Sequence, residues 1–145
     1  MTTVAAILKH KGYEVTTVEP TAYISDVVQV LAERRIGAVL VVDTAEQMLG
    51  IVSERDIVRC LATSGSRTFE MTAGQLMTRA VQVVHPDTTV AEAMKMMTAG
   101  RFRHLPVVYH GTLVGLISIG DVVKARIMDQ EMEVVSLTAY VTGSA

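Results

Sequence analysis

The chain has 145 residues, of which 50% are hydrophobic, and its formal net charge is −2. This charge gives no electrostatic reason to expect binding to nucleic acid or to an anionic membrane surface, and no apolar run approaches the ~20 residues of a membrane span. The single cysteine, Cys60, excludes an intrachain disulfide and fits a reducing compartment. The first residues lack the charged start and long apolar stretch of a signal peptide. We therefore expect a soluble cytoplasmic protein.

The first half of the chain predicts a β-α-β-β-α order of elements. Apolar residues at Ile24, Val27, Val28 and Leu31 follow the spacing of a helix with one buried face. Two apolar runs rich in β-branched residues follow, joined by a short polar loop, and predict a β-hairpin. The expected elements are a short helix over 4–8, a strand over 14–18, a helix over 24–35, strands over 36–42 and 48–52, and a helix over 57–62.

The second half predicts the same order again. Gly50–Val58 returns as Gly115–Val123, and the loop before the second glycine is one residue shorter, which a turn would absorb. A polar loop over 63–68 separates the copies. The expected elements are a short helix over 73–77, a strand over 80–84, a helix over 90–101, strands over 105–108 and 113–117, and a helix from 122 onward.

This order predicts an α+β (α/β) fold made of two β-α-β-β-α repeats. We expect the first repeat, with its lead-in helix, over residues 1–66 and the second over 67–128. Residues 129–145 would form a helical extension that either frays or packs on a second protomer.

Each repeat carries a Ser-x-x-Asp element at the junction of a strand and a helix, Ser53 with Asp56 and Ser118 with Asp121. Such a pair can be a variant of the capping box, which stabilises a helix start by about 1 kcal/mol. Aspartate, however, has a shorter side chain than the usual Glu or Gln and should reach the backbone less readily. An ionised carboxylate at a helix start can also bind the two vicinal hydroxyls of a ribose. Both interpretations stay open on the residues alone.

Several motifs, in the right order and twice over, resemble a tandem pair of CBS domains. They are Gly-Ile-Val-Ser-Glu-Arg-Asp at 50–56, Gly-Leu-Ile-Ser-Ile-Gly-Asp at 115–121, the segment Arg101–Val108 and the segment Arg79–Val90. The resemblance covers about residues 3–128. It implies two repeats packed about a pseudo-twofold axis, with two clefts that bind adenosine-containing molecules.

The resemblance also implies roles for individual residues. In one cleft Asp121 would hold the ribose, Ser118 the ribose or the first phosphate, and Arg103 and His104 the phosphate. The adenine would lie against residues of the first repeat, namely Thr17, Val18, Tyr23, Gly37 and Ala38. In the second cleft the ribose would meet Asp56 and Ser53, with Arg55 close by, and the base would meet Val83 and Thr89.

The implied function is a regulatory ligand sensor, not an enzyme. AMP is the expected ligand, with NAD(H), ATP and S-adenosylmethionine as alternatives. We expect a homodimer that signals to an unknown effector protein. The four histidines are too scattered for a metal set, so no metal is expected. The alternative is a structural or interaction scaffold in which both Ser-x-x-Asp elements are only helix caps.

Overall fold

The computed structural model describes residues 1–141; residues 142–145, the end of the predicted extension, lie outside the described residues. The chain forms two compact units. Unit 1 combines Met1–Glu14 with the chain from Gln82 onward, and unit 2 is Val15–Val81. This grouping differs from the predicted division at residues 66 and 67, because the N-terminal helix belongs to the unit of the second repeat.

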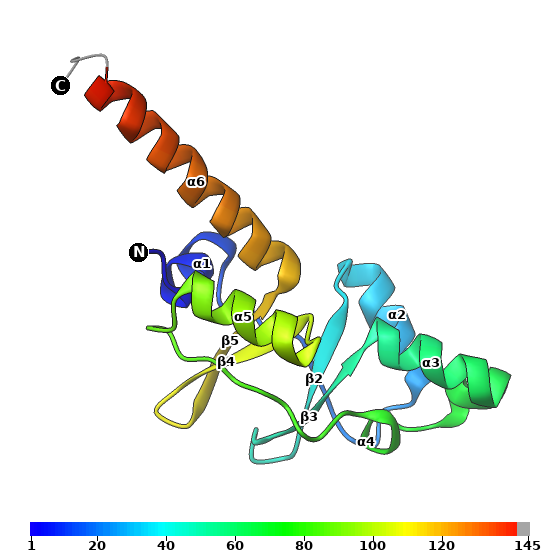
Figure 1. The fold of residues 1–145 in the computed structure, drawn as a ribbon. Helices are drawn as coiled ribbons and strands as arrows, with labels where there is room; N and C mark the ends of the chain where they lie inside the picture. The colour runs from blue at the N-terminus through cyan, green and yellow to red at the C-terminus, as the bar shows by residue number, and fades with distance from the viewer. Residues whose placement is uncertain (142–145) are drawn as a thin grey trace. The chain divides into compact units, whose positions relative to one another are not determined.

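Unit 2 is a three-stranded sheet covered by helices (Figure 1). Strand β1 pairs in parallel with β2, and β2 pairs antiparallel with β3. Ile24, Val27, Val39, Val41 and Val52 are buried between the sheet and the helices. Its elements are β1 (Thr17–Val18), α2 (Ile24–Arg34), β2 (Ala38–Val42), β3 (Met48–Ser53), α3 (Glu54–Ser64), the 3-10 helix η1 (Gly65–Glu70) and α4 (Ala73–Leu76).

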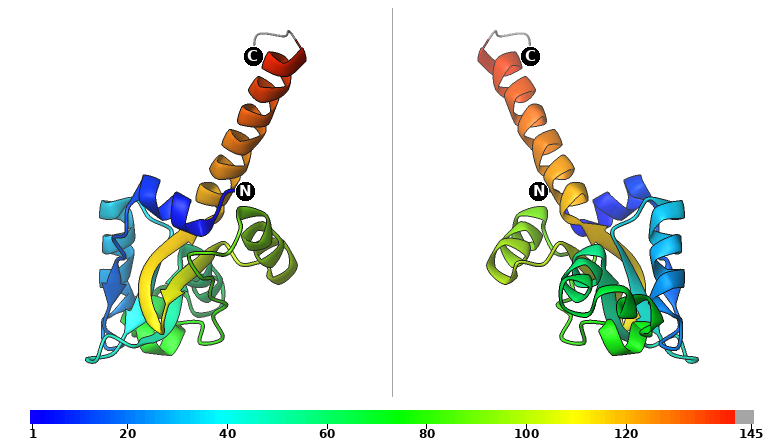
Figure 2. Two further views of the ribbon diagram at one scale, coloured as in Figure 1. Left: turned by 90° about the vertical axis from the view of Figure 1, so that its left-hand side faces the viewer. Right: turned by 90° about the vertical axis from the view of Figure 1, so that its right-hand side faces the viewer.

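Unit 1 is built on the antiparallel hairpin of β4 and β5. Its helices are α1, α5 and α6, and the buried residues Leu8, Leu105, Ile117 and Val122 join them to the hairpin. Helix α6 continues beyond the part that packs on α1 and α5 (Figure 2). The elements are α1 (Val4–Lys11), α5 (Val90–Gly100), β4 (His104–Tyr109), β5 (Thr112–Ser118) and α6 (Ile119–Val141).

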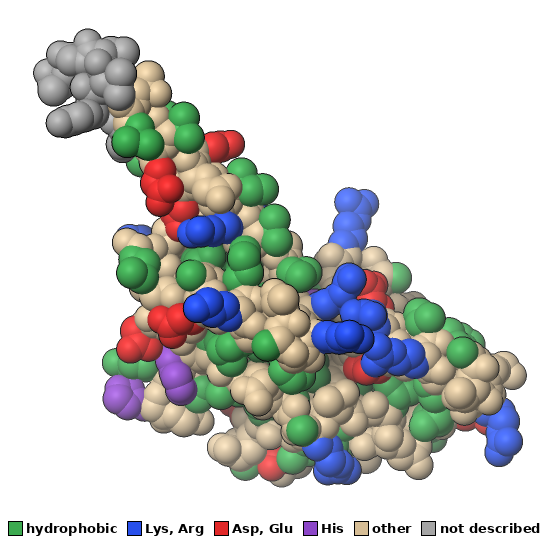
Figure 3. All heavy atoms as spheres, in the orientation of Figure 1, with side chains coloured by type: hydrophobic (Ala, Val, Ile, Leu, Met, Phe, Trp, Pro, Cys, Tyr) green, Lys and Arg blue, Asp and Glu red, His purple; other side chains and the backbone are tan. Residues whose placement is uncertain are grey.

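The far part of α6 exposes many apolar side chains, interleaved with acidic ones (Figure 3). Ile127 is 50% exposed and Val134 is 61% exposed. The predicted helical extension is present as part of α6, which continues as far as Val141.

The two short lead-in helices, α1 and α4, are held in the same way in the two units. In unit 1 the amide of Val4 donates to Thr88 O, and the amide of Val90 donates to Thr2 O. In unit 2 the amide of Ala73 donates to Ala22 O, and the amide of Ile24 donates to Met71 O. Both pairs of bonds fix the lead-in helix beside the start of the amphipathic helix, which explains why α1 belongs to the unit of the second repeat.

The predicted strands over 14–18 and 80–84 are mostly wrong. Only Thr17 and Val18 form a strand in unit 2, and only Val84 forms a bridge, with Val107, in unit 1. In unit 2 the amide of Leu40 donates to Thr16 O. The residue at the equivalent place in unit 1 is Pro106, which has no N–H to donate. The proline therefore removes the hydrogen bond that would have extended the second pairing.

The ends of the helices differ from the prediction in two places, after α2 and after α3. Arg35 and Arg101 adopt left-handed φ angles of 54° and 57°, and the amide of Ile36 donates back to Leu31 O, so that residues 36 and 37 cap α2 instead of starting a strand. The predicted polar loop over 63–68 is the end of α3 and part of η1. Thr68 is fully buried there, so this segment is part of the folded unit.

The shorter loop of the second copy is a tight turn, as predicted. His110 and Gly111, with φ of 49° and 75°, connect β4 and β5 in two residues. The longer loop of the first copy is organised by Asp43, whose Oδ1 accepts bonds from the amides of Ala45 and Gln47.

The repeated glycines of the motif give the lead-in segments room to approach the sheet. A Cβ on Gly50 would lie 2.6 Å from Thr78 O and 2.9 Å from Met77 Sδ. A Cβ on Gly115 would lie 2.7 Å from the side chain of Leu8 in α1. Each glycine therefore faces the segment that leads into the other copy of the repeat.

We predict that Gly50→Ala destabilises the protein by about 1–3 kcal/mol, because the new methyl group collides with the backbone at Thr78. The matched control is Gly120→Ala, whose Cβ would meet its nearest neighbour, Ser118 Oγ, at an ordinary 3.6 Å. The control should change stability by no more than about 0.5 kcal/mol. Urea denaturation measures both, and equal losses in the two variants would contradict the packing role of Gly50.

Candidate functional site

The helices α3 and α6 both start at a fixed point beside the neighbouring strand. The amide of Ile119 donates to Arg103 O at 2.8 Å, and the amide of Glu54 donates to Gly37 O at 2.9 Å. Each bond ties the first residue of the helix to the residue just before β4 or β2. The side chains of Asp121 and Asp56, in the first turn, are thereby positioned relative to the sheet.

Both Ser-x-x-Asp elements form complete helix caps. Asp121 Oδ2 accepts from the amide of Ser118 at 2.8 Å, and Ser118 Oγ accepts from the amide of Asp121 at 3.2 Å. Ser53 and Asp56 repeat the pattern at 2.9 and 3.2 Å. The expectation that aspartate reaches the backbone poorly is therefore wrong, because its carboxylate comes within ordinary hydrogen-bond distance in both copies.

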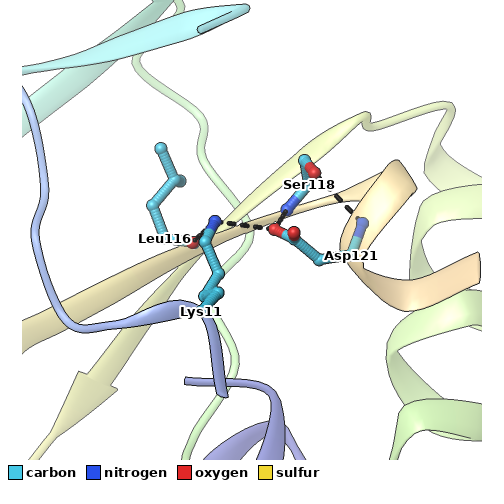
Figure 4. Close-up of polar contacts among 4 residues, drawn as sticks. All are labelled: Lys11, Leu116, Ser118 and Asp121. Atoms are coloured by element: carbon cyan, nitrogen blue, oxygen red, sulfur yellow. Dashed lines mark hydrogen bonds and ion pairs between the residues drawn. The ribbon is translucent and has the colours of Figure 1, made fainter. Parts of the chain in front are cut away.

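A lysine from α1 completes the environment of Asp121 (Figure 4). Lys11 Nζ lies 2.7 Å from Asp121 Oδ2 and donates a second bond to Leu116 O at 2.9 Å. The two side chains are 35% and 23% exposed, so the ion pair is half-buried. The bonds from Lys11 and from the Ser118 amide both go to Oδ2, and the Ser118 hydroxyl also interacts with the carboxylate.

Burial alone would raise the pKa of Asp121 by disfavouring its charged form. The hydrogen bond from Lys11, the bond from the Ser118 amide and the charge of Lys11 outweigh this effect and hold the pKa below its ordinary value. The carboxylate is therefore ionised at neutral pH and ready to accept hydrogen bonds from hydroxyl groups.

The structure brings Arg103 and His104 to the same end of unit 1. His104 is the register partner of Ser118 in the β4–β5 hairpin, so their side chains share one face of the sheet. Arg103 is exposed, and its carbonyl accepts the first amide of α6. These two residues thus lie next to Ser118, and their role toward a phosphate stays a prediction. Lys11 was missed because it is remote in sequence and belongs to no motif.

The second copy has the same cap without a cation. Asp56 Oδ2 accepts from the amide and from the hydroxyl of Ser53, both at 2.9 Å, and no ion pair to Asp56 occurs in the part of the chain that the structure describes. Arg55 is exposed beside it in the first turn of α3. Gly37 and Ala38 lie at the start of β2, where Ala38 pairs with Ser53.

The residues predicted to contact adenine are distributed over both units. Thr17 and Val18 form β1 of unit 2, and Tyr23 precedes α2 with 56% of its surface exposed. Thr89, in unit 1, caps α5 by accepting from the amide of Glu92, and Val83 precedes the bridge at Val84. Whether these residues share a ligand with Asp121 or Asp56 stays a prediction.

A pocket of about 270 Å³ adjoins the ion pair within unit 1. It lies between α1 and α6, with Lys11 and Asp121 in its wall together with Lys124. Much of the remaining lining is aliphatic, from Ala6, Ile7, Ala125, Met128 and Met132. The pocket provides free space next to the polar site.

Within residues 1–141, no group of three or more His, Cys, Asp or Glu side chains has the arrangement needed to hold a metal ion. Among the helices in the same range, none has the length and apolar character required to cross a membrane.

The lowered pKa of Asp121 predicts a pH-dependent stability. A carboxyl with a depressed pKa in the folded state stabilises the protein above its unfolded-state pKa of about 4, and this contribution is lost as the pH falls through the folded-state value. Lys11→Met should raise the pKa of Asp121 and remove at most about 1 kcal/mol at neutral pH, since the pair is partly exposed.

Urea denaturation between pH 3 and pH 7 tests this prediction, with Lys9→Met as the matched control because Lys9 is exposed on the same helix. The difference between wild type and Lys11→Met should shrink as the pH falls. A difference that is constant with pH, or that Lys9→Met reproduces, would contradict the role of the ion pair.

Comparisons with known proteins agree with this geometry. The CBS domain model matches residues 4–63 and 73–128. CBS domain-containing protein CBSX3, mitochondrial, of Arabidopsis thaliana is 34% identical over 98% of this chain and 73% of its own length. The crystal structure of a CBS-domain containing protein from Agrobacterium tumefaciens has a TM-score of 0.84 at 42% identity, over 86% of this chain and 93% of that one.

The solved structure of CBSX2 in complex with AMP is also similar, with a TM-score of 0.71 and 27% identity over 90% of this chain and 99% of that one. The two matched segments contain the duplicated strands, helices and Ser-x-x-Asp caps described above. The chain belongs to the CBS domain family and carries two copies of the domain.

Proposed function

We propose that the protein is a regulatory sensor of adenosine-containing nucleotides, with Asp121 as the residue that holds the ribose. The observation that carries the proposal is an ionised, half-buried carboxylate at the start of α6, whose hydrogen bonds from Lys11 and from the Ser118 amide both go to one oxygen, Oδ2. A carboxylate accepts two hydrogen bonds side by side, which suits the 2′ and 3′ hydroxyls of a ribose. The similarity to CBSX2, solved with AMP, supports this choice of ligand.

The neighbours of Asp121 provide the groups that a phosphate needs. Arg103 and His104 precede and begin β4, next to Ser118. Arginine binds phosphate through two parallel hydrogen bonds, and a neighbouring histidine adds another donor. In the proposal Ser118 binds the ribose or the first phosphate, and the adenine contacts Thr17, Val18, Tyr23, Gly37 and Ala38.

The second cap defines a second candidate site of the same kind. Asp56 and Ser53 would hold the ribose there, near Arg55, with Val83 and Thr89 beside the base. Gly37 and Ala38 stand where the other copy has Arg103 and His104, so this site has fewer groups for a phosphate. We therefore expect the Asp121 site to bind a nucleotide more tightly.

AMP is the first ligand of this proposal, followed by NAD(H), ATP and S-adenosylmethionine, because the basic residues favour a phosphate over a sulfonium group. The ligand would act by a population shift, binding one conformation of the protein more tightly than another. A homodimer would present that conformation to an effector protein in the cytoplasm.

The alternative function is a scaffold that binds no nucleotide. The completeness of both caps favours it, since each serine and aspartate already has a structural role. In that case loss of the Asp121 charge should lower stability by the same amount with and without nucleotide.

Thermal melts against AMP, ATP, NADH and S-adenosylmethionine distinguish the two functions. A ligand at 100 times its dissociation constant should stabilise the wild type by about 2.7 kcal/mol. Asp121→Asn, which removes the charge at nearly unchanged size, should abolish this stabilisation. Asp56→Asn should leave most of it, because the Asp121 site is expected to bind first.

Glu131→Gln, which removes an exposed charge from the same helix, is the matched control and should respond to ligand like the wild type. Stabilisation that survives Asp121→Asn would overturn the proposed role of this residue. The absence of any shift with all four nucleotides would favour the scaffold.

A further inference from the structure

The two copies of the Ser-x-x-Asp cap differ in one charged contact. Asp121 Oδ2 has the ammonium group of Lys11 at 2.7 Å, whereas Asp56 takes part in no ion pair among residues 1–141. The backbone bonds of the two caps agree to within 0.1 Å, at 2.8 against 2.9 Å for the serine amide and 3.2 Å in both for the aspartate amide. The cap itself therefore does not need the lysine.

The position of Lys11 is set by the core of unit 1. Helix α1 is anchored by Val4, Ile7 and Leu8, which are 0%, 6% and 1% exposed, and Leu8 packs on Gly115 of β5. Lys11 lies in the last turn of this helix, and its second hydrogen bond, to Leu116 O, holds its ammonium beside the end of β5 (Figure 4). The pairing with Asp121 is thus a consequence of the fold and not of a freely moving surface side chain.

A ribose whose two hydroxyls bind both oxygens of Asp121 has to compete with this ammonium for Oδ2. The hydroxyls of a ribose are neutral donors, so their bonds to a carboxylate lack the attraction between two opposite charges that the lysine provides. A nucleoside therefore has to weaken the contact of Lys11 with Oδ2 and brings no anion of its own in exchange. A nucleotide brings a phosphate to which the displaced ammonium can bind, and the adjoining pocket of about 270 Å³ leaves room for the flexible side chain to move.

We propose that Lys11 is a specificity-determining residue, which makes the Asp121 site select phosphate-bearing nucleotides over uncharged nucleosides. The inference rests on the proposed function, because it assumes that Asp121 holds the ribose. Lys11 acts twice in this discrimination: it opposes a ligand that offers only hydroxyls, and it adds a cation for a ligand that carries a phosphate.

Isothermal titration calorimetry with AMP and with adenosine tests the proposal on the full chain. In Lys11→Met the dissociation constant of adenosine should fall by about fivefold, the scale of a partly exposed ion pair. That of AMP should change much less, because the loss of the contact between Lys11 and the phosphate offsets the relief of competition at Asp121. The adenosine-to-AMP ratio of dissociation constants should thus fall by about fivefold. Lys9→Met, the same charge change at an exposed position of the same helix, should leave the ratio as in the wild type.

The outcomes distinguish a failure of the proposed role of Lys11 from a failure of the proposed nucleotide-sensing function. A wild type that binds AMP, together with a Lys11→Met variant of unchanged ratio, overturns the role of Lys11 and leaves the sensor intact. A change of equal size in Lys9→Met also overturns it, because the effect would then come from net charge. A wild type that binds neither AMP nor adenosine overturns the proposed function and the inference with it.

Discussion

The site depends on one backbone hydrogen bond per repeat, from the first amide of a helix to the residue before the neighbouring strand. Ile119 donates to Arg103 O in one unit, and Glu54 donates to Gly37 O in the other. With the helix start fixed to the sheet, an aspartate that follows the capping serine by three residues is placed over the end of the strand. The backbone amide of the capping serine then holds the carboxylate, so that no further side chain is needed to position it.

The two repeats share these backbone hydrogen bonds but differ in the residues that surround the cap. Arg103 and His104 border the cap in unit 1, whereas Gly37 and Ala38 take their place in unit 2. Lys11 adds a cation only to Asp121. Two caps of equal backbone geometry thus have different electrostatic surroundings among the described residues.

The sequence allowed the amphipathic helices and both hairpins to be predicted, because each follows from local periodicity or from a motif. It offered the caps only as one of two interpretations, and the reach of the aspartate side chain was underestimated. The lead-in strands failed because they depend on a partner strand, and Pro106 removes the donor that the second one required. The end of α3 and the 3-10 helix were mistaken for a loop because their polar residues gave no sign that Thr68 is buried. Lys11 could not be found, since only the packing of α1 on β5 brings it to Asp121.

The placement of α1 has a consequence for the order in which the protein forms during synthesis. Unit 2 is continuous in sequence, but α1 precedes it in the chain and packs against residues made much later, such as Leu105, Ile117 and Val122. Its apolar side chains Val4, Ile7 and Leu8 must stay exposed until those strands emerge. Folding of unit 1 is therefore delayed until the chain has been translated past Val122, and the Lys11–Asp121 contact forms only after all of unit 2 has been made.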